Sequence, residues 1–192
     1  PVLSKIYAIY DSGDRRKIEY LDRELKQILE DAFYVESKIG KEFALLNMLK
    51  IKYIKARDGK MAWREAMKAA SEDLIRDGYF DERYVREAIG NVEEYGSYII
   101  VNKGIALAHA RKESGVYEDG LSLLVSKDGI LFDEGETVHL LFFFSQKGET
   151  DYLDLFKEII KLGKDQNDVD RIRNLTDSME IYRTMWEILS RN

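Results

Sequence analysis

The sequence TVHLLFFF, at Thr137–Phe144, is the most apolar run in the chain. Apolar and polar residues do not alternate along it, so a strand formed here must be covered on both faces. Such a strand lies in the interior of a sheet, with other elements packed above and below it. The run therefore predicts an α/β fold in which one sheet carries helices on both faces.

Helical patterns flank the predicted strands on both sides. Before them, apolar residues at helical spacing predict a helix from about Trp63 to Asp77-Gly78, and Asp81 is a suitable N-cap for the next helix. After them, Asp177 begins a capping-box-like sequence that predicts the last helix. The other predicted strands cover residues 51–55, 97–101, 105–107, 120–125 and 130–132, with a turn at residues 127–129 between the last two.

The sequence predicts two parts: a helical linker or extension of residues 1–40 and a domain of residues 41–192. A short helix is expected before Ser12-Gly13 and a longer amphipathic helix after Asp14. A connecting or dimerising helix and a helix packed on the following domain explain this pattern equally well, so a homodimer is left open. The chain starts at Pro1 rather than Met, which suggests a fragment of a longer protein.

Composition excludes several classes of function. The chain has no cysteine, which excludes disulfides and thiol catalysis and fits a reducing cytoplasm. Two histidines without cysteine argue against a transition-metal site, which usually needs about four such ligands. No apolar run approaches the roughly 20 residues that span a bilayer. The 30 basic residues are interspersed with 36 acidic ones, for a net charge of −6, and form no basic face for nucleic acid. We expect a cytoplasmic protein with no membrane insertion and no direct nucleic-acid binding.

His109 is the main candidate for chemistry. It follows the apolar run at residues 105–107, so we expect it at the end of a strand, between neighbours too small to cover it. Imidazole titrates near neutrality and is a competent nitrogen nucleophile, and Arg111 could hold an anion beside it. From the residues alone, an ordinary strand-end histidine is an equally good explanation. His139 lies inside the most apolar run, and we interpret it as structural.

Several stretches, taken in order, resemble one family. They are WREAM at 63–67, DGY at 77–79, YVREAI at 84–89, NVEEYGSYIIV at 91–101, GIALAHAR at 104–111, GV at 115–116 and GLSLL at 120–124. Together they resemble the IIA component of the bacterial sugar phosphotransferase system, in the mannitol/fructose-type superfamily, with spacing closer to the ascorbate-type branch. The resemblance covers about residues 44–192 and implies a mixed β-sheet sandwiched between helical layers.

The resemblance also implies a function for His109. It would accept a phosphoryl group from the phosphohistidine of a small carrier protein and pass it to a cysteine of the IIB component, without a metal, nucleotide or other cofactor. Such a transfer needs an exposed nitrogen held in one tautomer and hydrogen-bond donors for the phosphoryl oxygens. Arg111 is a candidate donor, although it could equally pair with Glu113. Backbone amides at the start of a helix could do the same work.

Two positions depart from the family's pattern. Ala108 stands where the family usually has proline. The replacement of proline by alanine loosens the loop but leaves the nucleophile. Tyr152 stands where the family often has a second histidine. A tyrosine can donate a hydrogen bond to a phosphoryl oxygen but cannot serve as a cationic partner, and His139 does not fall at that position. These changes are compatible with phosphorylation of His109 and leave onward transfer open.

Three functions follow from the sequence. Residues 3–29 are similar to the helical segment before the IIA-like domain of phosphotransferase-system-controlled antiterminators and activators. This favours a C-terminal regulatory domain, in which a phosphate of roughly −1.5 to −2 charge changes contacts with neighbouring domains. A transport IIA component, an enzyme that hands phosphate to IIB during sugar uptake, is the second. A non-catalytic interaction domain with the same fold is the third. The sequence does not identify the sugar.

Overall fold

The computed structural model describes Gln27, residues 42–133 and residues 135–191. The helices predicted before residue 40 lie outside these residues, except for Gln27, which is helical. The division of the chain at residue 40 therefore stays a prediction.

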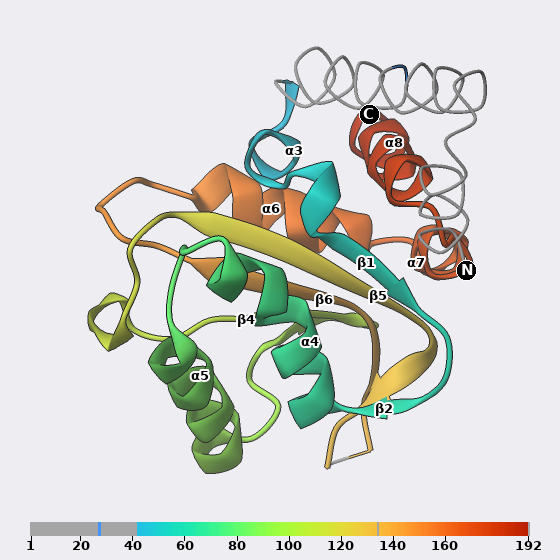
Figure 1. Cartoon of the computed structure of the whole chain (residues 1–192). Coiled ribbons are helices and arrows are strands. Elements are labelled where there is room, and N and C mark those ends of the chain that lie inside the picture. The colour runs from blue at the N-terminus through green and yellow to red at the C-terminus, as the bar shows by residue number, and fades with distance from the viewer. Residues whose placement is uncertain (1–26, 28–41, 134, 192) are drawn as a thin grey trace, which may run out of the picture.

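A six-stranded mixed sheet forms the centre of the described part (Figure 1). Its strands are β1 (Ile54–Arg57), β2 (Met61–Ala62), β3 (Ile100–Asn102), β4 (Ile105–Ala108), β5 (Gly120–Leu131) and β6 (Thr137–Ser145). The strand order is β1-β5-β6-β4-β3, with β2 beside the end of β5. Strands β1 and β2 run parallel to β5, and β4 runs parallel to β6, whereas the β5–β6 and β3–β4 pairs are antiparallel. The most apolar run thus forms an interior strand, as predicted.

Helices cover both faces of this sheet (Figure 1). One face carries α4 (Trp63–Arg76) and α5 (Glu82–Tyr95), and the other carries α3 (Ala44–Met48), α6 (Leu153–Leu162), α7 (Gln166–Arg173) and α8 (Ser178–Leu189). Successive residues of β6 point to opposite faces: Phe142 packs with α6 and α8, and Phe143 packs with α4 and α5. The predicted sandwich of a mixed sheet between helical layers is confirmed.

Helix boundaries follow the predicted caps. The Asp81 carboxylate accepts a hydrogen bond from the Arg83 amide at the start of α5, and Asp177 accepts from two amides in the first turn of α8. Helix α4 ends at Arg76, and Gly78 follows with a φ of +82°, the left-handed conformation that glycine adopts without strain.

The prediction of two strands at residues 120–125 and 130–132 is wrong, because β5 is one strand. Its pairing with β6 is irregular between Val125 and Ile130. The amide of Gly129, whose φ is +103°, donates to the hydroxyl of buried Ser126, and the exposed residues between them bulge from the ladder. The polar residues at 127–129 therefore mark a β-bulge rather than a turn between strands.

Two other strands begin later than predicted. Residues Ile51–Tyr53 form a 3₁₀ helix, η3, and β1 starts only at Ile54. Residues 97–99 form a turn, and β3 starts at Ile100. Ile99 in that turn is 1% exposed. An apolar side chain can be buried without lying in a strand, which is why the apolar pattern extended both predicted strands too far.

Candidate active site

His109 directly follows β4, at the carboxyl end of that strand. The parallel pairing of β4 with β6 ends where Ala108 lies beside Phe143. Ala108 is fully buried, whereas His109 is exposed. The structure thus places the imidazole at the end of a strand, beside small neighbours, as predicted.

The His109 ring is oriented by two contacts. Its Nδ1 lies 3.1 Å from the carbonyl oxygen of Leu107, and the ring of Tyr98 meets it edge to face with 6.0 Å between ring centres. A carbonyl oxygen can only accept a hydrogen bond, so the Leu107 contact requires the proton on Nδ1. In the neutral imidazole, Nε2 is then the unprotonated nitrogen that can act as a nucleophile.

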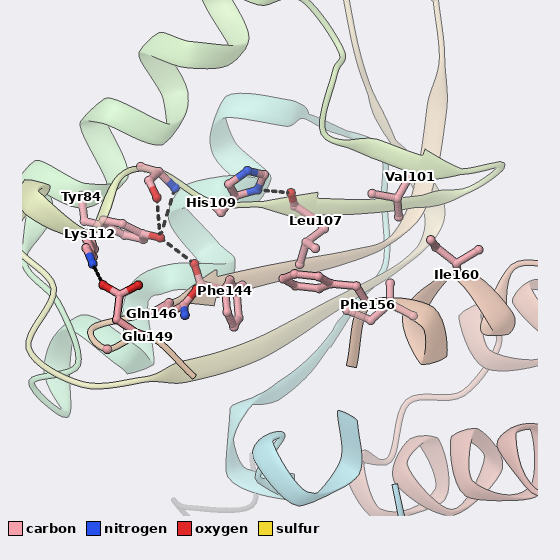
Figure 2. Close-up of a pocket in the computed structure, with 13 residues that line it drawn as sticks. Tyr84, Val101, Leu107, His109, Lys112, Phe144, Gln146, Glu149, Phe156 and Ile160 are labelled. Atoms are coloured by element: carbon pink, nitrogen blue, oxygen red, sulfur yellow. Dashed lines mark hydrogen bonds and ion pairs between the residues drawn. The ribbon is translucent and has the colours of Figure 1, made fainter. Parts of the chain in front are cut away.

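A pocket of about 620 Å³ opens beside His109 (Figure 2). Much of its wall is apolar and comes from β3, β4, β6 and α6: Val101, Leu107, Phe144, Phe156, Ile159 and Ile160. Its polar side chains are Tyr84, His109, Lys112, Gln146 and Glu149. The candidate nucleophile therefore borders an apolar depression with a few polar groups, an arrangement typical of a binding site.

An ion pair between Lys112 and Glu149 closes one end of the pocket, opposite Val101 and Ile160 (Figure 2). Lys112 begins a 3₁₀ helix, η4 (Lys112–Ser114), and Glu149 lies in the loop between β6 and α6. The hydrogen bond between the two side chains raises the pKa of Lys112 and lowers that of Glu149. The pair connects the two loops that surround the site and places a lysine on the rim of the pocket.

Tyr84 is a site residue that nothing in the sequence marks as such, because its helical spacing predicts only a buried position in α5. Its hydroxyl accepts a hydrogen bond from the Ala110 amide at 3.1 Å and donates one to the Phe144 carbonyl at 2.9 Å. Burial raises the pKa of Tyr84 to about 12, so the hydroxyl keeps its proton at neutral pH. Helix α5 is thereby bonded to the residue that follows His109.

The other two predicted site residues do not line the pocket with His109. Arg111 is exposed, and within the described ranges its side chain forms no hydrogen bond or ion pair, including the alternative pair with Glu113. Tyr152 precedes α6, and its hydroxyl donates to Oδ2 of Asp119 at 2.5 Å. Burial is the larger cause, and this hydrogen bond the next, of a rise in the pKa of Tyr152 to about 12. Its ring packs edge to face on Phe144, a wall of the pocket. The roles of Arg111 and Tyr152 stay predictions.

His139 lies at the other end of the sheet from His109. Its amide bonds to the carbonyl of Gly104, before β4 begins, and its Nδ1 lies 2.9 Å from the Ser126 carbonyl at the β5 bulge. These contacts agree with the structural interpretation. Among the described residues, no cluster of three or more histidine, aspartate or glutamate side chains could hold a metal ion. No helix in the described part of the chain is long and apolar enough to cross a membrane.

Comparison with known proteins shows the family to which the chain belongs. The family model described as "Phosphoenolpyruvate-dependent sugar phosphotransferase system, EIIA 2" matches residues 47–187. The chain belongs to this family. The ascorbate-specific PTS system EIIA component of Escherichia coli K12 is 27% identical over 122 residues, which cover 62% of this chain and 79% of that protein.

Solved structures agree with this assignment. A crystal structure of a PTS IIA protein (PtxA) from Streptococcus mutans has a TM-score of 0.66 and 27% identity, covering 73% of this chain and 90% of that one. The Escherichia coli complex of the mannitol enzyme IIA with phosphorylated mannitol enzyme IIB gives a TM-score of 0.59 at 18% identity, covering 70% of this chain and 94% of that chain. The second likeness shows the fold alone. The resemblance drawn from the sequence is confirmed at the level of the family, and the link to a transcription regulator stays a prediction.

Proposed function

We propose that this chain is a phosphoryl carrier that accepts a phosphoryl group on Nε2 of His109 from the phosphohistidine of a carrier protein. The observation that carries the proposal is the exposed imidazole with Nδ1 beside the Leu107 carbonyl. The Nε2 lone pair forms the new N–P bond, the N–P bond to the donor histidine breaks, and its electron pair returns to the donor nitrogen. The proton stays on Nδ1, which donates a hydrogen bond to the Leu107 carbonyl, and this contact stabilises the positive charge that develops on the ring.

Donors for the phosphoryl oxygens come from the surrounding loops. Arg111 is our first candidate, because its guanidinium forms no hydrogen bond or ion pair within the described ranges and lies two residues from His109. Tyr152 can donate to a phosphoryl oxygen only by giving up its bond to Asp119. Its more direct effect is to support the Phe144 wall of the pocket. No metal or cofactor is needed in this mechanism, since transfer depends on positioning and charge.

Two roles for the phosphorylated chain are equally supported: transfer of the phosphoryl group to a IIB component, and regulation by the phosphate on His109. A cysteine of a IIB component is favoured by the relative described as an ascorbate-specific EIIA component and by the complex of a IIA with a phosphorylated IIB. A regulatory role in a cytoplasmic antiterminator or activator is favoured by the resemblance of residues 3–29 and by Tyr152 in place of a second histidine. In that case residues 1–40 are the linker to the rest of the regulator.

The first test is labelling by phosphoenolpyruvate and the purified general phosphotransferase proteins. We expect an acid-labile label on the wild-type chain, none on the His109→Gln variant and full labelling of the matched His139→Gln variant. An unlabelled wild-type chain, with a known IIA domain labelled in parallel, would refute phosphoryl transfer and leave the non-catalytic interaction domain.

A second test separates the two roles. The labelled chain is mixed with an ascorbate-type IIB component and with a variant of that component lacking its cysteine. Rapid loss of label to the intact IIB alone supports the transport role. Label that stays on His109 in both mixtures supports the regulatory role.

A further inference from the structure

Two backbone groups lose their sheet partners where β4 and β6 separate. The ladder between these parallel strands ends at the Ala108–Phe143 pair, while β6 continues to Ser145. Just past this point, the amide of Ala110 and the carbonyl of Phe144 face the gap. Buried backbone groups need a partner in place of the ladder.

The Tyr84 hydroxyl fills this gap (Figure 2). It accepts from the Ala110 amide at 3.1 Å and donates to the Phe144 carbonyl at 2.9 Å, so it bridges the two strands beyond their last backbone pair. The Ala110 carbonyl, at 3.3 Å, is a second acceptor. One side-chain oxygen thus holds the backbone at Ala110 and the backbone at Phe144 at a fixed separation where β4 and β6 diverge.

The hydroxyl is held firmly because its ring is packed in the core. Tyr84 is 1% exposed, and its ring lies against Phe80 and Phe143, with ring centres 5.0 Å and 6.1 Å away. Helix α5, which carries it, is fixed at its start by the Asp81 cap. Close packing of this kind leaves the side chain little freedom to follow a moving loop.

His109 is therefore constrained on both sides. Before it, the Leu107 amide bonds to the Ile99 carbonyl at 2.8 Å. After it, the Ala110 amide bonds to Tyr84. We propose that Tyr84 is a positioning residue for phosphoryl transfer: through the Ala110 backbone it sets the direction of the His109 imidazole, without touching the phosphoryl group. This inference rests on the proposed function of His109.

The test compares Tyr84→Phe with the matched variant Tyr182→Phe. Tyr182 is also fully buried, and its hydroxyl donates to the Leu46 carbonyl at 2.6 Å on the other side of the sheet. Each variant removes one buried hydroxyl that bonds to the backbone, but only Tyr84 adjoins the site. We expect labelling of Tyr84→Phe by the phosphorylated carrier protein to be about 10- to 100-fold slower, since small misplacements of a reacting group have effects of this size. Tyr182→Phe should be labelled at the wild-type rate.

A second measurement does not depend on phosphorylation. The chain has two histidines, so ¹⁵N NMR of the imidazole nitrogens gives two sets of signals, with His139 as an internal reference. In wild type and Tyr182→Phe, we expect the His109 signals of a ring with its proton on Nδ1. In Tyr84→Phe, they should move toward a mixture of tautomers while those of His139 stay in place.

The possible outcomes are distinguishable. Tyr84→Phe that matches Tyr182→Phe in nitrogen signals and labelling rate overturns the inference, because the hydroxyl would then support the fold alone. A signal change without a slower rate also overturns it, because the direction of the imidazole would then have no effect on phosphoryl transfer. If the wild-type chain takes no label, the proposed function fails, and the nitrogen signals decide whether Tyr84 orients His109.

Discussion

Replacing Tyr84 by phenylalanine should destabilise the protein at neutral pH by an amount that shrinks in alkali. At neutral pH the variant loses the partner of the buried Phe144 carbonyl and of the Ala110 amide. An unsatisfied buried backbone group costs about 1–3 kcal/mol. We therefore expect the free energy of unfolding of Tyr84→Phe to lie about 1–3 kcal/mol below that of wild type at pH 8.

The pH dependence follows from the tyrosine's pKa in the two states. A tyrosine in the unfolded chain has a pKa near 10, and burial raises that of Tyr84 to about 12 in the folded protein. Between these values the unfolded chain releases the proton and the folded protein keeps it, so wild-type stability falls as pH rises. Two pKa units correspond to about 2.7 kcal/mol, of which about half is lost by pH 11. The variant has no hydroxyl at position 84, so its free energy of unfolding does not fall for this reason.

The assay is urea unfolding of both proteins at pH 8, 10 and 11, followed by tryptophan fluorescence. The other tyrosines and the lysines titrate in both proteins, so their effects cancel in the difference between the two. That difference should fall by about 1.4 kcal/mol between pH 8 and pH 11. A constant difference over this range would show that the Tyr84 hydroxyl has an ordinary pKa, which would refute its burial between β4 and β6.

Four further substitutions test the fold. Gly90 lies inside α5 with open space around it, so Gly90→Ala should raise the free energy of unfolding in urea by about 0.5–1 kcal/mol. Gly115→Ala should lower the thermal midpoint more than Gly59→Ala, because both have positive φ but only a Cβ at Gly115 meets the Asp81 carboxylate; equal losses would contradict this packing. Phe142→Ala should cost about 3–5 kcal/mol in urea unfolding, since Phe142 is fully buried.

Local patterns in the sequence predicted much of the fold. The unbroken apolar run at Thr137–Phe144 predicted an interior strand, and Asp81 and Asp177 predicted helix starts that their side chains cap. The errors fell where a local pattern has two solutions. Polar residues with a glycine suit a turn as well as a bulge, so β5 was divided in two. An apolar residue in a turn can be buried as well as one in a strand, so β3 was predicted too long.

The candidate site was only partly visible in the sequence. The position of His109 after a strand followed from its small, apolar neighbours. Arg111 was the donor predicted from the sequence, yet it is the next residue, Lys112, that lines the pocket and pairs with Glu149. Sequence distance did not indicate which side chain faces the pocket, because that depends on the path of the loop after β4.

The sequence by itself determined the alternation of helices and strands, the interior strand β6 and the candidate nucleophile His109. Each depends on residues that are neighbours in the chain. The tertiary structure alone decided that Tyr84 of α5 bridges Ala110 and Phe144, which lie 26 and 60 residues away in the chain. The physical reason is that sheet order and helix packing bring these groups together, and the hydroxyl's partners exist only where β4 and β6 diverge.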